Sequence, residues 1–412
     1  MWFLARNDWG WVIVYEYDGR ERLFTGHTGR IFLLLTTIWL TISLTSRMLP
    51  PLLPAIIDDL AITAFLGGVA LTVERITRAG VEFPSGRLAD GLTRTTVLVC
   101  CLGLVIIGVL LLSISTTYVL FLVGVAVFGI GRGMYTPAAV AMLSDIFREK
   151  RGSAIGFNKT GSELAGIIGA GVAIVIVSVA TWRGAFLPLV AILIPLLIAL
   201  YVTSRESVQF GRVALDPRAT GLRLLRTPQI RWIVVVYSLY VVASSGVSTF
   251  LPIFLIEVHG VSFAFASSAF ALLYVVGLIA KPVSGIISDR IPRLYVAGGG
   301  LAIGAGGLAI LVMAPLAIVA IGGVLIYAFG YRGVTPALQA FLMDRFPDET
   351  MGGDFGAVRT VYLLIGSLGP AYAGLTASVF GFVPAFASFL LFYLFGAVVL
   401  LWFSIYGWPG EA

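Results

Sequence analysis

The sequence predicts an all-α membrane protein in which twelve transmembrane helices form two pseudo-symmetric six-helix bundles. The chain is 59% apolar and only 12% charged, about half the charged fraction of a soluble domain. Apolar stretches long enough to cross a bilayer recur along almost its whole length, and basic residues gather in alternate connections. The expected spans lie near residues 31–54, 61–84, 94–114, 117–143, 153–179, 186–203, 231–257, 264–287, 294–314, 316–343, 355–379 and 383–406.

The connections predict the orientation of the chain. One set holds nearly all of the basic residues outside the spans, and the opposite set holds only Arg183, with Asp58, Asp59 and Glu257 on or beside it. The positive-inside rule then places both termini in the cytoplasm, so the net charge of +6 gives no reason to expect a nucleic-acid partner. The excess of arginine over lysine favours a GC-rich prokaryotic source, and hence the inner membrane. The basic connections carry Arg87, Arg94, Arg148, Lys150, Arg151, Arg205, Arg212, Arg218, Arg223, Arg226, Arg290, Arg293 and Arg345.

Five segments follow from this pattern. The first is a cytoplasmic extension, too charged for a signal peptide, in which Asp18-Gly19 favours a hairpin turn if the segment is ordered. A linker with several arginines and two prolines separates the two bundles. The expected boundaries are 1–30 for the extension, 31–203 for the first bundle, 204–230 for the cytoplasmic linker, 231–406 for the second bundle and 407–412 for a cytoplasmic tail.

The two halves of the chain repeat each other. Short patterns recur at an offset of 199 or 200 residues on the two sides of the linker. An offset shared over several loops and helices indicates an internal duplication, so we expect two bundles of the same architecture. The matched pairs are Gly86 and Gly285, Asp90 and Asp289, Pro137 and Pro336, Asp145 and Asp344, Gly156 and Gly356, Thr160 and Thr360, Gly166 and Gly366, and Gly169 and Gly369.

Six plus six helices, a basic central connection and the repeated Gly-x-x-x-Asp loop resemble the major facilitator superfamily over residues 31–406. The superfamily's signature after the second helix is G-x-L-A-D-R-x-G-R-R, and the chain has GRLADGLTRT at 86–95 and GIISDRIPRL at 285–294. TWRGAF at 181–186 is similar to the superfamily's turn between the fifth and sixth helices. The resemblance implies a transporter, usually monomeric, in which two bundles rock around a central site by alternating access. It leaves the substrate open.

The repeated loop also has a physical role. Gly86 and Gly285 are expected to end their helices and to let the chain turn sharply. Asp90 and Asp289 can then pair with basic loop residues or cap a neighbouring helix. Such contacts would hold the cytoplasmic side closed in one state and would break in the other. The alternative is that each aspartate only caps a helix. The basic loop residues concerned are Arg94 and Arg293.

Four charged residues fall inside the second span. Glu74, Arg75, Arg78 and Glu82 lie on one face of a helical wheel. That face must meet protein or water, because an ionised side chain at mid-bilayer costs about 2.5–3.5 kcal/mol. One interpretation is a self-neutralised ladder of Glu74–Arg78 and Arg78–Glu82 pairs. Glu74, which is deeper, and Glu82 are also candidates to carry a coupling proton.

A second interpretation makes part of this face a gate. The repeat offsets place Lys281 at the position of Glu82 and Arg359 at that of Lys159. In the superfamily's architecture the second helix meets the eleventh and the fifth meets the eighth. That resemblance would place Glu82 opposite Arg359, and Glu163 opposite Lys281. We expect both pairs as cytoplasmic salt bridges that form when the inner side closes.

Two arginines lie at related positions in the fourth and tenth spans. Arg132 in FGIGRGMYTPA is thirteen residues before Asp145, and Arg332 in FGYRGVTPA is twelve before Asp344, which places both roughly 18–20 Å deep. Guanidinium groups bind carboxylates and phosphates bidentately. The two arginines could therefore clamp an anion between the bundles, with Arg47 of the first span adding a third positive charge.

A structural role for these arginines is the open alternative. Each could hydrogen-bond carbonyls freed near Pro137 or Pro336, or pair with Glu74. Many superfamily members carry an arginine early in the fourth helix, where this chain has Val125. Arg132 is therefore a different residue, and the role of the superfamily arginine does not transfer to it. The fifth helix lacks the proline of the antiporter pattern, since residues 166–171 read GIIGAG. This departure disfavours a drug–proton exporter.

Together these features favour a secondary transporter for a small organic anion, with proton symport. The alternatives are an exporter of hydrophobic or cationic compounds, for which an acidic cavity is expected, and a sensor that binds a ligand without transporting it. An enzyme is not expected, because the spans hold no His, Cys or Ser–base constellation. No metal or other cofactor is implied. The expected partners are the substrate, a coupling proton and the lipid bilayer.

Overall fold

The computed structural model describes residues 2–7, 10–15, 23–91, 93–147, 150–204, 228–345 and 351–407. Helices make up nearly all of this part of the chain. The elements in chain order are β1 (Trp2–Asn7), β2 (Gly10–Tyr15), α1 (Gly26–Asp59), α2 (Ala64–Gly91), α3 (Arg94–Ser113), α4 (Tyr118–Ile146), α5 (Arg151–Val179), the short 3-10 helix η1 (Trp182–Ala185), α6 (Leu187–Ser204), α8 (Pro228–His259), α9 (Phe263–Ser288), α10 (Arg293–Met313), α11 (Ala317–Met343), α12 (Met351–Gly366), α13 (Gly369–Phe380) and α14 (Phe382–Tyr406).

The prediction of twelve helical spans in two bundles is confirmed. Among the described residues, eleven helical segments are long and apolar enough to cross a membrane. One of them, Phe355–Phe380, comprises most of α12 and all of α13, which are separated only by a turn at Ser367 and Leu368. The twelfth span is α2, whose charged residues lower its hydropathy.

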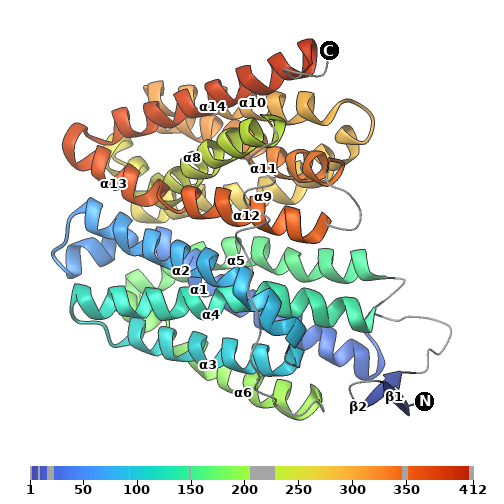
Figure 1. The fold of residues 1–412 in the computed structure, drawn as a ribbon. Coiled ribbons are helices and arrows are strands. Elements are labelled where there is room, and N and C mark those ends of the chain that lie inside the picture. Colours follow the sequence, from blue (N-terminus) through green and yellow to red (C-terminus); the bar gives the residue numbers. More distant parts are fainter. Residues whose placement is uncertain are drawn as a thin grey trace.

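The two bundles lie side by side (Figure 1). The first contains α1 to α6 and the second α8 to α14, and both ends of the described chain lie at the same end of the bundles. Across the interface α2 packs against α12 and α13, α5 against α9, and α1 against α8. We call the end at which α2, α4, α9 and α11 terminate the basic end, because the basic connections lie there. Most of the expected linker, residues 205–227, is outside the described part.

Matching hydrogen bonds show that the bundles share one geometry. Ser85 Oγ in α2 donates to the carbonyl oxygen of Gly133 in α4 at 3.4 Å. Ser284 Oγ in α9 donates to that of Gly333 in α11 at 2.5 Å. The offset is therefore 199 residues between α2 and α9, and 200 residues around Gly133 and Gly333. These offsets identify equivalent positions in the two halves.

The loop arginines pair within their own bundles. Arg94 Nε is 3.3 Å from Asp145 Oδ2, and Arg293 Nη1 is 2.9 Å from Asp344 Oδ2. Asp289 is exposed at the C-terminal end of α9 and has no ion pair with a described residue. The arginine pairs tie α3 to α4 and α10 to α11, so in this conformation they brace each bundle and do not link the two.

The expectation that Gly86 and Gly285 end their helices is wrong. Helix α2 continues to Gly91 and α9 to Ser288. A glycine inside a helix costs only about 1 kcal/mol, so a single glycine does not by itself end a helix. The side chain of Asp90 lies outside the described part, so its expected pairing stays a prediction.

A two-stranded hairpin precedes the first bundle. Strands β1 and β2 pair antiparallel, with Asn7 opposite Gly10. The turn therefore comes earlier in the chain than the Asp18-Gly19 turn expected from sequence, and those two residues lie outside the described part.

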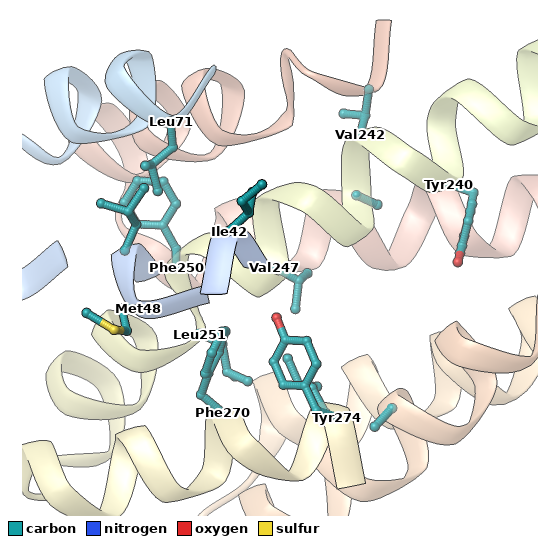
Figure 2. Packing of buried hydrophobic residues seen from close by; sticks show 14 of the residues in the cluster. Ile42, Met48, Leu71, Tyr240, Val242, Val247, Phe250, Leu251, Phe270 and Tyr274 are labelled. Atoms are coloured by element: carbon teal, nitrogen blue, oxygen red, sulfur yellow. The ribbon is translucent and has the colours of Figure 1, made fainter. Parts of the chain in front are cut away.

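Away from the basic end, the bundles meet through close backbone contact. The Ala371 amide of α13 donates to Thr72 Oγ1 of α2 at 2.9 Å, and a Cβ on Gly68 would collide with the carbonyl group of Pro370. Apolar side chains from α1, α2, α8 and α9 fill the space nearby in one continuous cluster (Figure 2). Among those labelled there are Ile42, Met48, Leu71, Phe250, Leu251 and Phe270.

Candidate functional site

A buried ion pair lies inside the first bundle. Arg132 Nη1 in α4 is 2.6 Å from Glu74 Oε1 in α2 and 2.8 Å from Ser46 Oγ in α1, and the two charged side chains are 5% and 4% exposed. Glycines near Arg132 make this contact possible, since a Cβ on Gly129 or Gly133 would crowd the backbone of α2. Helix α4 therefore lies close enough to α2 for the arginine to reach the carboxylate.

The corresponding arginine of the second bundle has different partners. Arg332 Nη1 in α11 is 3.5 Å from Glu163 Oε2 in α5, and its Nε donates to the carbonyl oxygen of Leu273 in α9 at 3.0 Å. The guanidinium carbon lies 4.6 Å from the ring centres of both Tyr274 and Tyr331. Cation–π contacts of this kind stabilise a buried guanidinium without neutralising it.

An asymmetry between the bundles explains the difference. At the offset of 199 residues, Glu74 of α2 corresponds to Leu273 of α9. The second bundle therefore has no carboxylate where Arg132 finds one. Arg332 instead reaches a carboxylate that belongs to the first bundle.

Glu163 holds two bases of the second bundle. Its Oε1 accepts a hydrogen bond from Lys281 Nζ at 2.5 Å, while Oε2 faces the arginine of α11. Helices α5 and α9 are close here, because a Cβ on Gly166 would collide with the ring of Tyr274 and one on Gly277 would lie 3.0 Å from Glu163 Oε2. The two bundles therefore meet around a buried carboxylate.

A second ion pair joins the bundles nearer the basic end. Arg359 Nη2 in α12 is 3.0 Å from Glu82 Oε1 in α2. Lys159 of α5 is exposed beside them and lies near enough to repel both Arg359 and Lys281. The structure thus brings together both pairs placed opposite each other from the sequence, Glu82 with Arg359 and Glu163 with Lys281.

Three more arginines at the interface lack a carboxylate. Arg47 Nη2 in α1 is 3.4 Å from Ser162 Oγ in α5, and Arg75 Nη2 in α2 is 3.5 Å from Thr249 Oγ1 in α8. Neither of these arginines nor Arg78 forms an ion pair with a described residue, and the Nε atom of each is buried without a hydrogen-bond partner. A charged side chain without a counter-charge is energetically costly inside the membrane.

The self-neutralised ladder is not what the structure shows. Glu74 and Glu82 pair with α4 and α12, so Arg78 has no ion pair with a carboxylate that the structure describes. Sequence reasoning counted Arg75 and Arg78 as neutralised and therefore missed them as site residues. Surface pairs four residues apart contribute only about 0.2–0.5 kcal/mol. The alternative that Arg132 pairs with Glu74 is the arrangement that the structure shows.

The interface is strongly basic. Among the side chains that the structure describes there, the charged ones are eight bases and three carboxylates, which leaves an excess of five positive charges. Such a site attracts anions, and guanidinium groups suit carboxylates and phosphates. Among the described residues no cluster of His, Cys, Asp and Glu could hold a metal ion. The bases are Arg47, Arg75, Arg78, Arg132, Lys159, Lys281, Arg332 and Arg359, and the acids are Glu74, Glu82 and Glu163.

Comparison with known proteins supports the fold. The family model of the Major Facilitator Superfamily matches residues 35–370. Among solved structures, the chain is similar to a bacterial homolog of the human lysosomal transporter Spinster in an inward-facing, unoccupied conformation (TM-score 0.81, 16% identity, 94% of this chain and 100% of that chain). No curated protein matches the chain.

Two further structures belong to transporters with stated ligands or couplings. A D-xylose–proton symporter matches with a TM-score of 0.76 and 16% identity, over 93% of this chain and 98% of that chain. A POT family transporter in complex with 5-aminolevulinic acid matches with a TM-score of 0.78 and 12% identity, over 92% and 96%. At these identities the similarity shows the fold alone.

Proposed function

The chain belongs to the Major Facilitator Superfamily of membrane transporters, and we propose that this member carries a small organic anion, bound through a carboxylate, by alternating access. The observation that carries the proposal is the excess of five positive charges among the described side chains of the bundle interface. An uncompensated charge at mid-membrane costs about 2.5–3.5 kcal/mol. A bound anion would offset part of that cost.

Arg132 and Arg332, with Arg47 beside them, are the proposed substrate-binding residues. Arg132 and Arg47 belong to the first bundle and Arg332 to the second. A carboxylate that accepts hydrogen bonds from both sides would draw the bundles together, and charge-assisted hydrogen bonds to guanidinium are strong and directional. Arg75 and Arg78 add positive potential at the same interface, which favours entry of an anion.

The ion pairs nearer the basic end are the proposed gate. Glu82 with Arg359 and Glu163 with Lys281 each join the two bundles. By the positive-inside rule this end is cytoplasmic in the inner membrane, so their formation corresponds to a closed inner side. Opening toward the cytoplasm would require both pairs to separate.

Proton coupling is part of the proposal. Neutralising Glu74 would free Arg132 for the substrate, and neutralising Glu82 would release Arg359 from the gate. Either event favours transport of the anion together with a proton, that is, symport.

Thermal stabilisation of the purified protein by candidate ligands tests this function. Carboxylates, phosphates, lipophilic amines and neutral sugars would be compared, because a ligand that binds the native state raises its stability by RT ln(1 + [L]/Kd). We expect stabilisation by carboxylates that is lost in Arg332→Gln. Stabilisation by the lipophilic amines, with no stabilisation by the carboxylates or phosphates, would indicate an exporter of cationic compounds. Anion binding without flux in liposomes would indicate a sensor.

A further inference from the structure

Glu163 lies at the junction between the proposed anion site and the proposed gate. Oε1 is 2.5 Å from Lys281 Nζ and Oε2 is 3.5 Å from Arg332 Nη1, and the carboxylate side chain is only 8% exposed. Both bases belong to the second bundle, whereas Glu163 belongs to the first. A single carboxylate thus ties the substrate arginine and the gate lysine of one bundle to the other bundle.

The equivalent arginine has no such link. Arg132 pairs with Glu74, and both residues lie within the first bundle. Breaking that pair changes no contact between the bundles, whereas breaking the contacts of Glu163 removes two. The absence of a carboxylate at Leu273, the counterpart of Glu74, is what makes Arg332 depend on the opposite bundle.

We propose that Glu163 competes with the substrate's carboxylate for Arg332, so that binding of the anion removes one of the two contacts by which Glu163 joins the bundles and favours opening of the basic end. This inference rests on the proposed anion substrate. A bound carboxylate can offer Arg332 two oxygens at hydrogen-bonding distance, in place of one oxygen at 3.5 Å. Glu163 would then keep only Lys281, so one contact between the bundles would remain in place of two.

Protonation of Glu163 would have the same effect as its displacement. The groups around it are Lys281 and Tyr274 from α9, Arg332 from α11 and Arg47 from α1, with Lys159 about one turn away on its own helix. Glu163 is the acid of this group, so a proton on it removes the charge that competes with the anion. Anion and proton are then taken up together, and Glu163 joins Glu74 and Glu82 as a coupling carboxylate.

Two measurements on the full-length protein test the inference. The first is the affinity for succinate, lactate and gluconate. The second is the distance between spin labels at Ser153→Cys and Ile287→Cys, which are exposed at the basic ends of α5 and α9, after Cys100 and Cys101 are replaced by alanine. We expect Glu163→Gln to bind the anion about tenfold more tightly, or about 1.4 kcal/mol, and to populate a longer label distance without any anion.

Glu74→Gln is the matched control. It makes the same chemical change to an equally buried carboxylate that also holds a substrate arginine, but within one bundle. Its label distances should match those of the wild type. Addition of the binding acid to the wild type should produce the longer distance seen in Glu163→Gln.

Lys281→Gln supplies an independent check should Glu163→Gln fail to fold. Glu163 then holds Arg332 alone, so the anion should bind several-fold more weakly, while the labels still separate. If the wild type binds an acid but Glu163→Gln and Lys281→Gln bind it unchanged, the inference fails and the proposed function stands. If no acid binds any of these proteins while lipophilic amines do, the proposed function fails as well.

Discussion

Arg132 and Arg332 occupy equivalent positions in the two bundles, yet Arg132 pairs with a carboxylate of its own bundle and Arg332 with one of the other. The first contact therefore belongs to the stability of one bundle. The second belongs to the closure of the two bundles against each other. Substitution of Arg132 and substitution of Arg332 should therefore have different effects on the protein.

Arg132→Gln should destabilise the protein far more than Arg332→Gln. The first change leaves Glu74 buried without its base, and breaking a buried ion pair on one side costs about 3–5 kcal/mol. Glu163 would still keep Lys281 after the second change. Unfolding of the purified variants in detergent measures the difference. The double variant Glu74→Gln/Arg132→Gln should recover most of the loss, and equal losses in the two single variants would refute the asymmetry.

Charge reversal tests the pair between Glu82 and Arg359. Either single reversal, Glu82→Arg or Arg359→Glu, should open the basic end, since two like charges would then face each other across the interface. The exchange of both should restore closure. Reactivity of a cysteine introduced at the interface toward a membrane-impermeant reagent reports the opening. The same exchange at Arg94 and Asp145, which pair inside the first bundle, should leave that reactivity unchanged.

Gly166→Ala should weaken the contact between α5 and α9. A Cβ at this position collides with the ring of Tyr274, and overpacking typically costs about 1–3 kcal/mol. Gly171→Ala is the control on the same helix, because its Cβ would meet open space and alanine favours a helix over glycine. Thermal unfolding should show a lower melting temperature for Gly166→Ala alone. Equal melting temperatures of the two variants would mean that the close approach of α5 to α9 does not stabilise the protein.

Arg75→Gln should weaken anion binding while leaving the fold intact. The arginine forms no ion pair with a described residue, and its closest polar partner is Thr249 Oγ1 at 3.5 Å, so little is lost besides positive potential. We expect a several-fold rise in the Kd of a stabilising acid, with the melting temperature nearly unchanged. Lys150→Gln, on a basic connection at the end of the bundles, should leave the Kd as it is. Unaltered binding in Arg75→Gln would remove this residue from the site.

Much of the fold could be predicted from the sequence, because a bilayer imposes simple rules. Span length, loop charge and the offset repeat each depend on local composition, and they gave the twelve spans and the two halves. The prediction that Glu82 lies opposite Arg359 also required the arrangement of helices in the superfamily that the chain resembles. The structure places these residues 3.0 Å apart.

The features of the structure that differ from the sequence-based predictions depend on which of several available partners a residue contacts. Whether Glu74 pairs with Arg78 on its own helix or with Arg132 on the next is decided by burial and by the glycines that bring α4 against α2. Likewise, Gly86 is of the residue type that often ends a helix but lies inside α2, since one glycine costs a helix only about 1 kcal/mol. The link between Glu163 and Arg332 needs three helices placed together, which no spacing within one helix can reveal.

Uptake by the reconstituted protein tests the central claim most directly. Radiolabelled succinate, lactate and gluconate would be offered to liposomes that contain the wild type or Arg332→Gln, with a proton gradient directed inward and with protein-free liposomes as the background. The account predicts uptake of at least one acid by the wild type, faster with the gradient and lost in Arg332→Gln. Equal uptake by both proteins, or transport of lipophilic amines with none of the acids, would contradict it.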